Sequence, residues 1–181
     1  MGEFYFVRHG QSEWNVANKI CGITDIALTD RGRQDALQAA EHIKAQNLKI
    51  DMILTSPLIR AKETAMIISE KTGIPLREEP RLMEQCFGIY EGTARDAEEF
   101  RIAKMRFADR YGNGESMFMT AHRVYGLLDE ITAQEDTVYL LAAHNGLARI
   151  IESYFRTMTN EEFASFGVKN AEIVRYPYTV K

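Results

Sequence analysis

The chain has 181 residues, of which 45% are hydrophobic and 27% are charged, and its formal net charge is −4 at pH 7. This length and composition are typical of a globular protein, and we expect residues 1–181 to form one domain with a sizeable core. The slightly acidic balance argues against nonspecific nucleic-acid binding, and the sequence has no apolar run long enough to cross a membrane.

The expected elements alternate between strands and helices. Short apolar and β-branched runs predict the strands, and segments that keep one side apolar predict the helices. The first half contains strand 3–8, helix 29–46 with Thr29 as its N-cap, strand 51–55, helix 57–72 and strand 75–77. The second half contains a helix from Thr93 to about 110, a second to about 134, strand 137–142, helices 146–156 and 160–165, and strand 171–176.

This order of elements predicts the fold class. Strands that alternate with helices along a chain form a mainly parallel sheet that is covered on both faces. We therefore expect an α/β fold of three layers, with a mainly parallel central sheet and helices on both faces. The long helical part over about 93–134 is expected to fold over the functional site as a cap insertion.

Three of the expected strands lead into charged or titratable side chains. The first ends in Arg8 and His9, the second is followed by a helix that carries Arg60, and strand 137–142 is followed by His144. Ligands of open α/β sheets bind outside the carboxyl ends of the strands, where helix N-termini also attract anions. The stretch from Arg8 to Gly10 alone also fits a surface turn, but two arginines and two histidines together indicate a cationic pocket for phosphate.

The segment VRHGQSEWN resembles the signature of the histidine phosphatase superfamily, which includes the cofactor-dependent phosphoglycerate mutases. The resemblance continues in order along the chain through GITDIALTDRGRQDA, TSPLIRAKET, LMEQCFGIYEG, GES and AAHNG. It therefore covers essentially the whole chain.

Phosphate binding requires groups that neutralise three oxygens. Arg8 and Arg60 are the best candidates, because a planar guanidinium group binds phosphate in a bidentate manner. Asn15 and His144 can add hydrogen bonds, although His144 is alternatively a core histidine that caps the following helix. Glu63 lies one helical turn after Arg60 and is interpreted only as the partner of an ion pair with it. No metal or cofactor is implied, because the arginines repel cations.

The resemblance implies that His9 is the nucleophile. Its attack on phosphorus gives a phosphohistidine that water hydrolyses; the alternative is that His9 only donates an orienting hydrogen bond. Attack requires an unprotonated nitrogen, so the other ring nitrogen should donate to an acceptor, such as a backbone carbonyl near Gly10. The resemblance also implies that Glu84 gives a proton to the leaving alkoxide, with Glu91 as the competing carboxylate.

Residues at the substrate entrance are expected to influence the choice of substrate. Gln11 stands where the family often has a glutamate, and Cys21 and Gly22 belong to a stretch that lacks an aromatic residue of the family pattern. Glu115 lies in the Gly-Glu-Ser segment, which opens a helix near the entrance in the family. The same segment is also an ordinary helix start with an acidic first turn.

We therefore expect a metal-independent phosphomonoesterase that acts through a phosphohistidine on a small phosphorylated metabolite. The alternatives are a phosphoglycerate mutase and, from another class, a non-catalytic module that binds phosphate or phosphopeptides. The segment FGIYEG resembles the phosphatase branch, and the chain is shorter than the mutases, which leaves less material for a closed lid. All the candidate catalytic residues are present, which argues against the binding module.

The expected partner is a small-molecule phosphate ester, with neither nucleic acid nor membrane, and the sequence leaves a homodimer open. A cytoplasmic location is expected, because the first apolar run is only four residues long and follows Glu3, unlike a secretory signal. Cys21 and Cys86 are too few for a disulfide framework and indicate free thiols.

Overall fold

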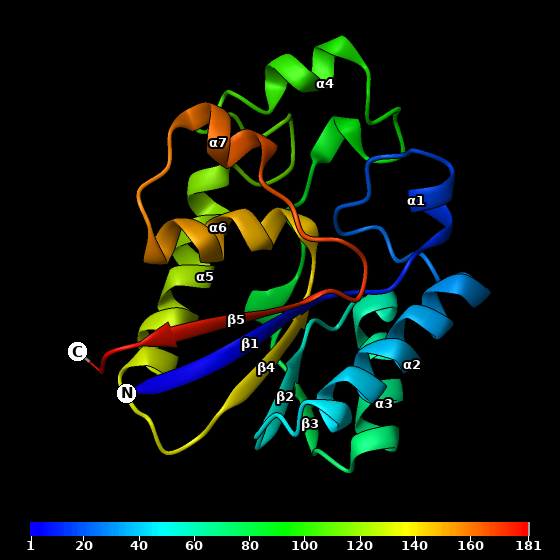
Figure 1. The fold of residues 1–181 in the computed structure, drawn as a ribbon. Coiled ribbons are helices and arrows are strands. Elements are labelled where there is room, and N and C mark those ends of the chain that lie inside the picture. Colours follow the sequence, from blue (N-terminus) through cyan, green and yellow to red (C-terminus); the bar gives the residue numbers. More distant parts are fainter. Residues whose placement is uncertain (181) are drawn as a thin grey trace.

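In a computed structural model, which describes residues 1–180, a five-stranded sheet lies between two layers of helices (Figure 1). Its strands are β1 (Gly2–Arg8), β2 (Met52–Thr55), β3 (Leu76–Glu78), β4 (Tyr139–Ala143) and β5 (Ile173–Tyr178). Their order is β3-β2-β4-β1-β5, and neighbours are parallel except β5, which is antiparallel to β1. The predicted α/β fold with a mainly parallel sheet is confirmed. Lys181, the last residue of the expected domain, lies outside the described residues.

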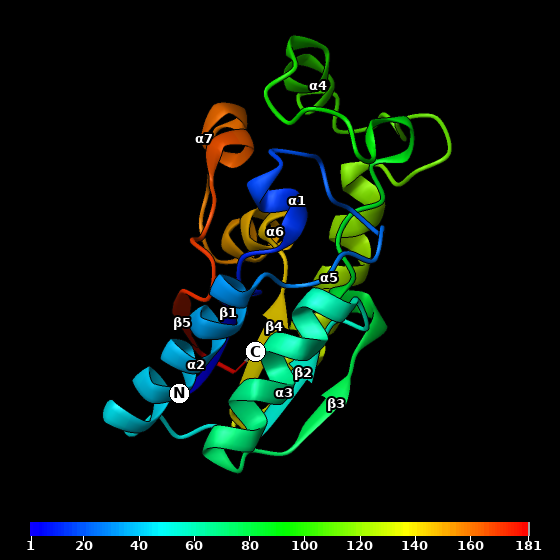
Figure 2. The same ribbon diagram turned by 90° about the vertical axis from the view of Figure 1, so that its right-hand side faces the viewer.

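The helices cover both faces of the sheet. They are α1 (Glu13–Val16), α2 (Asp30–Ala45), α3 (Ile59–Thr72), α4 (Glu98–Ala103), α5 (Met117–Thr132), α6 (Asn145–Phe155) and α7 (Asn160–Ser165), with 3-10 turns at Pro80–Leu82 and Gly88–Tyr90. Helices α2 and α3 pack on one face, and α5 and α6 on the other (Figure 2). Within residues 1–180, no helix is long and apolar enough to span a bilayer.

Strand β1 shows how the sequence builds the two apolar layers. Phe4 and Phe6 belong to the cluster with α5 and α6, whereas Tyr5 and Val7 belong to the cluster with α2 and α3. This division follows from the alternation of side chains along a strand. All four residues are buried, because helices cover both faces of the sheet. The continuous apolar run of β1 thus reflects its position inside the sheet, where helices cover both of its faces.

Helix α2 begins where the sequence predicts. The Thr29 hydroxyl accepts a hydrogen bond from the Gly32 N–H at 3.0 Å and so caps the first turn. Helix α3 ends at Gly73, whose φ of 76° lies in the left-handed region that favours glycine. These two helices lie on the same face of the sheet, and each begins after a loop at the carboxyl end of the preceding strand (Figure 2).

The helix expected from Thr93 to about residue 110 is wrong. Helix α4 spans only Glu98–Ala103, and the chain later turns through a positive φ at Tyr111 and Gly112. Phe100 packs with Tyr111 in a small separate apolar cluster instead of continuing a helix. Tertiary packing of short segments therefore overrides local helix propensity in this part of the chain.

Helix α5 is also not part of a cap. Its residues Val124, Leu127 and Ile131 are buried in the cluster that covers the sheet. The helix begins at Ser116, whose hydroxyl accepts a hydrogen bond from the Met119 N–H. Within residues 93–134, the segment before α5, which contains α4, lies beyond the carboxyl end of the sheet (Figure 1). The expectation of a cap over 93–134 is thus wrong for α5 and stays a prediction for the segment before it.

Candidate active site

The carboxyl ends of β1, β2 and β4 bring the predicted site residues together. Strand β4 lies between β1 and β2, and its register pairs Ala143 with Arg8. The residues that follow these strands therefore meet at one edge of the sheet, as expected for an open α/β fold. There the imidazole rings of His9 and His144 lie 5.3 Å apart between their centroids.

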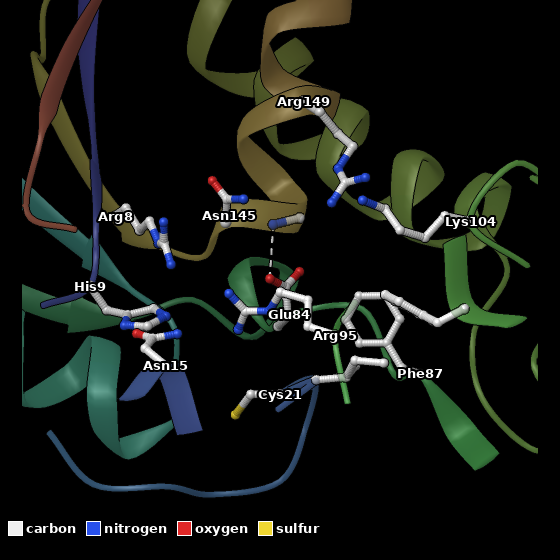
Figure 3. A pocket seen from close by; sticks show the side chains of 13 residues that line it. Arg8, His9, Asn15, Cys21, Glu84, Phe87, Arg95, Lys104, Asn145 and Arg149 are labelled. Atoms are coloured by element: carbon white, nitrogen blue, oxygen red, sulfur yellow. Dashed lines mark hydrogen bonds between the residues drawn. The ribbon is translucent and has the colours of Figure 1, made fainter. Parts of the chain in front are cut away.

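A cavity of about 100 Å³ lies at this edge (Figure 3). Five of the residues that the sequence proposed for the site line it: Arg8, His9, Asn15, Cys21 and Glu84. Two others, Arg60 and His144, are fully buried at the same edge but do not line the cavity. Within residues 1–180, the remaining three entrance residues are not part of the lining either: Gln11, Gly22 and Glu115.

The geometry of His9 fixes its tautomer. Its ring is buried, and Nδ1 lies 2.7 Å from the Gly10 carbonyl oxygen. A carbonyl can only accept, so Nδ1 carries the proton and donates it, which leaves Nε2 with a free lone pair. Burial, followed by the nearby charges of Arg60 and Arg8, lowers the pKa of His9 well below 6.5. The imidazole is therefore neutral at neutral pH.

His144 is a second buried, neutral imidazole. Its Nε2 lies 2.8 Å from the Ser56 hydroxyl, and burial, with the charge of Arg60, lowers its pKa well below 6.5. His144 occupies the N-cap position of α6, but its side chain makes no capping hydrogen bond. The capping alternative for this residue is therefore wrong. Its Nδ1 is buried and has no hydrogen-bond partner within residues 1–180.

Arg8 and Arg60 each rest on backbone carbonyls. Arg8 Nη1 donates to the Val168 oxygen at 2.7 Å, and burial lowers the pKa of this guanidinium group to about 10. Arg60 donates to the carbonyls of Thr24 at 2.9 Å and Gly22 at 2.7 Å. The Nε atoms of both arginines are buried without a hydrogen-bond partner in the described chain. Each arginine is thus positioned by the protein and keeps an unused donor.

Glu91 organises the loop that holds Arg60. Its carboxylate accepts hydrogen bonds from the backbone N–H groups of Gly22 at 3.0 Å and Ile23 at 3.1 Å, and from the Thr24 hydroxyl at 2.7 Å. A Cβ at Gly22 would lie 2.3 Å from the Gln85 carbonyl oxygen, a backbone atom that cannot easily move, so this position accepts only glycine. Glu91 is therefore a structural carboxylate, and Gly22 supports Arg60 instead of lining the entrance.

Glu84 lies in the cavity wall with both oxygens held by the backbone. Oε1 accepts from the Gln85 N–H at 2.9 Å, and Oε2 accepts from the Gly146 N–H at 2.9 Å, which is the dashed line in Figure 3. Gly146 lies in the first turn of α6, so the helix N-terminus faces this carboxylate. Each oxygen keeps a lone pair for a substrate or a proton. Glu84 is thus better placed for proton transfer than Glu91.

Asn15 belongs to α1, a short helix that the sequence analysis did not predict. Ser12 and Asn15 form a reciprocal capping box, in which the Asn15 Oδ1 accepts from the Ser12 N–H at 3.0 Å. Asn170 Nδ2 donates to the same Oδ1 at 3.3 Å and to the His9 carbonyl at 2.9 Å. These bonds orient Asn15 so that its amide nitrogen is left for a ligand. Gln11 instead accepts from the Thr29 hydroxyl at 2.9 Å.

Glu115 supports the Glu84 loop from behind. Its carboxylate contacts the guanidinium group of Arg123 through Nη2 at 3.0 Å and Nε at 3.1 Å, and accepts from the Cys86 N–H at 3.1 Å. Arg123 also donates to the Met83 carbonyl at 2.7 Å. The interpretation of Glu63 as the partner of Arg60 is wrong, because Glu63 pairs with Arg33 at 2.7 Å.

Cys21 lines the cavity as a neutral thiol. Its Sγ lies 3.6 Å from the Thr24 carbonyl, and burial raises the pKa of the thiol to about 11. A thiol with so high a pKa is a poor nucleophile at neutral pH. Within residues 1–180, no three His, Cys, Asp or Glu side chains are grouped so that they could hold a metal ion. Independence from metal ions stays a prediction.

Four polar residues of the cavity wall were missed by the sequence analysis: Arg95, Lys104, Asn145 and Arg149. Asn145 Oδ1 accepts from the Val168 N–H at 2.8 Å and so fixes the segment whose carbonyl holds Arg8. Arg149 carried a detectable signal, because it is a cation on the buried face of an amphipathic helix. Arg95 and Lys104 lie in the irregular segment before α5, where no periodic pattern marks them.

The sequence of the chain is similar to those of known proteins over most of its length. The sequence model of the histidine phosphatase superfamily (branch 1) matches residues 4–180. The chain is 33% identical over 173 residues to the 2,3-bisphosphoglycerate-dependent phosphoglycerate mutase of Bartonella quintana, which covers 88% of this chain and 84% of the relative. It is also 33% identical to a probable phosphoglycerate mutase of Erwinia tasmaniensis, with 97% and 84% covered.

Solved structures show the same fold. The mycobacterial glucosyl-3-phosphoglycerate phosphatase, in its complex with VO3, superposes with a TM-score of 0.83 at 28% identity, covering 97% of this chain and 90% of that chain. A structure described as mycobacterial hydrolase 1 also gives a TM-score of 0.83 at 28% identity, with 96% and 90% covered. The similarity in sequence and in fold thus extends over nearly the whole chain.

Proposed function

The chain belongs to the histidine phosphatase superfamily, and we propose that it is a phosphomonoesterase that acts through a phosphohistidine formed on His9. The geometry of this imidazole carries the proposal. His9 lines the cavity, and its Nδ1 is engaged by the Gly10 carbonyl, so Nε2 is the nitrogen with a free lone pair. A buried, neutral imidazole of fixed tautomer is suited to nucleophilic attack on phosphorus.

The reaction proceeds in two balanced steps. In the first, His9 Nε2 forms a bond to phosphorus while the bond from phosphorus to the alkoxide oxygen breaks, and protonated Glu84 gives its proton to that oxygen. In the second, a water molecule gives a proton to Glu84 and its oxygen bonds to phosphorus, which releases phosphate and restores His9. Both Glu84 oxygens are oriented by backbone N–H groups, which supports this role.

Three unpartnered nitrogen atoms support phosphate binding at the same place. The Nε atoms of Arg8 and Arg60 and the Nδ1 atom of His144 are buried and lack hydrogen-bond partners within residues 1–180. Buried polar atoms are rarely left without a partner, and functional sites are among the common exceptions. Phosphate oxygens next to His9 would accept from these atoms, and the amide of Asn15 and the N-terminus of α6 would add further donors.

Hydrolysis is favoured over mutase activity because little of the chain is available to close the cavity against water. A mutase has to keep water from the phosphohistidine until the phosphoryl group is returned. Here the segment before α5 contributes one helix of six residues, α4, beyond the carboxyl end of the sheet. Mutase activity remains the second candidate, because relatives at 33% identity are named phosphoglycerate mutases.

The size of the cavity favours a small metabolite. Its volume of about 100 Å³ is below the roughly 300–1,000 Å³ of pockets that enclose drug-sized ligands. A phosphorylated side chain of a protein would also need an open groove for its flanking peptide. The proposed substrate is therefore a short phosphate ester in which little more than the phosphate and a few carbon atoms enter the cavity.

The test measures phosphate release from p-nitrophenyl phosphate and from a panel of small phosphorylated metabolites, with chelator present. Turnover that survives chelator, is blocked by vanadate and disappears in His9→Ala is expected, with an acid-labile phosphate trapped on the wild-type protein. Full turnover by His9→Ala would refute the nucleophile, and loss of turnover with chelator would refute metal independence. Isomerisation of phosphoglycerate without phosphate release would identify a mutase. Anion binding without either reaction would identify a binding module.

A further inference from the structure

A carboxylate on α2 lies behind the nucleophile, outside the cavity wall, and one peptide group joins the two. We propose that Asp35 is a positioning residue for the nucleophile, which acts on His9 through the peptide group between Gly10 and Gln11. Its charge polarises this peptide group, holds the Nδ1 proton of His9 in place and stabilises the positive charge that the ring acquires on attack. The inference rests on the proposed function, because it concerns the formation of the phosphohistidine.

A continuous chain of hydrogen bonds joins the two side chains. The Gly10 carbonyl oxygen lies 2.7 Å from His9 Nδ1 and accepts its hydrogen bond. The Gln11 N–H donates to Asp35 Oδ2 at 3.2 Å. This carbonyl and this N–H belong to the same peptide group, which is trans, so its two polar bonds point in opposite directions. The imidazole and the carboxylate therefore lie on opposite sides of one polarisable group.

The peptide group is fixed by the helices around it. The Gly10 N–H donates to the Thr64 hydroxyl at 3.1 Å, and the Gln11 carbonyl accepts from the Thr29 N–H at 3.0 Å. A Cβ at Gly32 would lie 2.0 Å from that Gln11 oxygen, so this backbone rests directly on the first turn of α2. The chain of hydrogen bonds from the carboxylate to the imidazole is thus built into the fold.

The ion pair that Asp35 forms does not explain its position. Asp35 is 9% exposed and lies on the face of α2 that also buries Ala36 and Ala39, where a charged group loses much of its hydration. Arg31 Nε contacts Asp35 Oδ1 at 2.9 Å, but the Arg31 side chain is 69% exposed, and exposed ion pairs contribute little. A basic residue four positions before the acidic one is also the weaker order on a helix. A further role is therefore needed to account for a carboxylate on this buried face.

The proposed reaction needs a negative charge at this place. When His9 Nε2 bonds to phosphorus, Nδ1 keeps its proton and the ring becomes positively charged. Burial and the charges of Arg60 and Arg8 lower the pKa of His9, whereas the hydrogen bond to the Gly10 carbonyl raises it. Hydrogen bonds in a chain strengthen one another, so a carboxylate on the far side of the peptide group increases the effect of that bond. In the catalytic triad of serine proteases a carboxylate supports a histidine in the same manner, but by direct contact.

The alternative is that Asp35 only ties the loop to α2. Loss of such a tie would misplace His9 and slow both steps of the reaction. A charge that acts on the ring has effects of opposite sign on the two steps. Without it, the phosphohistidine forms more slowly, because positive charge develops on the ring, and is hydrolysed faster, because that charge disappears. The experiment therefore measures the two steps separately.

Asp35→Asn is compared with wild type and with Asp30→Asn. The first variant keeps the size of the side chain and an acceptor oxygen for the Gln11 N–H, but removes the charge. The control removes a carboxylate from the first turn of the same helix, where the side chain is exposed and pairs with Arg33. Single-turnover release of p-nitrophenolate gives the rate of phosphorylation, and decay of the trapped phosphohistidine gives the rate of hydrolysis. NMR spectra of the resting protein record the Nδ1 proton of His9, which is assigned by its loss in His9→Ala.

In Asp35→Asn we expect phosphorylation to be about threefold slower and hydrolysis about threefold faster, which together correspond to the loss of the charge from one hydrogen bond. The Nδ1 proton should shift upfield, and Asp30→Asn should change neither the rates nor this signal. Slowing of both steps, or an unchanged Nδ1 proton, would overturn the proposal. If Asp35→Asn does not fold, the pair Asp35→Glu and Asp35→Gln, which differ in charge at equal length, decides by the same measurements. If wild type forms no phosphohistidine, the proposed function fails, and the Nδ1 proton still shows whether Asp35 polarises the peptide group.

Discussion

Gly146 offers a direct test of the role assigned to Glu84. A Cβ at this position would lie 2.2 Å from Glu84 Oε1 and 2.8 Å from its carboxyl carbon. In Gly146→Ala the carboxylate therefore has to move by roughly 1 Å, the scale at which misplacement of a reacting group costs about 10²-fold in rate. The atom that must move is the far end of a side chain, so the fold should tolerate the change. Alanine in place of glycine within α6 even favours the helix by about 1 kcal/mol.

The loss should depend on the leaving group. An alkyl phosphate expels a basic alkoxide that needs a proton, whereas p-nitrophenolate leaves without one. We expect Gly146→Ala to lower kcat for alkyl phosphates by about 10²-fold and kcat for p-nitrophenyl phosphate by only a few fold. The assay is steady-state phosphate release across a series of esters with leaving groups of graded pKa, in which the slope should steepen in the variant.

Gly126 supplies the matched control. It also lies within a helix, α5, but a Cβ there would meet nothing within 4 Å. Gly126→Ala should therefore leave every rate unchanged and raise the melting temperature slightly. An equal loss for all esters in Gly146→Ala, or no loss for alkyl phosphates, would refute the assignment of Glu84 as proton donor.

Two further predictions concern the charges at the site. Because burial and Arg60 lower the pKa of His9 below 6.5, the acid limb of kcat/KM for p-nitrophenyl phosphate should lie below pH 6.5; a limb above that value contradicts a buried neutral nucleophile. Glu91→Gln replaces one acceptor oxygen of the carboxylate by a donor NH2 group in the loop that holds Arg60. It should raise the inhibition constant of phosphate about tenfold, which corresponds to the loss of about one charge-assisted hydrogen bond. Glu63→Gln is the control and should not change this constant, because Glu63 pairs with Arg33.

The phosphate end of the site could be predicted from the sequence because regular structure builds it. The strands before His9 and His144 are apolar runs buried on both faces, and parallel strands necessarily end at the same edge of the sheet. The long helices α2 and α5 follow from caps and apolar faces, as Thr29 and Ser116 illustrate. The periodicity of the sequence therefore places the two histidines at the same edge of the sheet, and the pairing of β1 with β4 brings them side by side.

The rest of the site could not be predicted, because tertiary contacts and not local patterns determine it. The segment before α5 is shaped by the packing of Phe100 and Tyr111 against Phe87 and by the ion pair of Glu115 with Arg123. These contacts leave no periodic mark in the sequence. A helix was consequently expected where the chain turns, and Lys104 was not recognised. Arg149 could have been found, since it interrupts the buried face of α6.

The contrast between the regular strand ends and the irregular segment before α5 helps to explain how one fold can carry different activities. The groups proposed for phosphoryl transfer stand on strand ends and on the first turn of α6, where the sheet holds them rigidly. Lys104 and Arg149, which line the far side of the cavity, stand at the end of α4 and on the inner side of α6, against the short helix α7. Changes in α4 and α7 can alter this side of the cavity without disturbing His9. Relatives named mutases and structures named phosphatases can therefore share the site at the strand ends and differ beyond it.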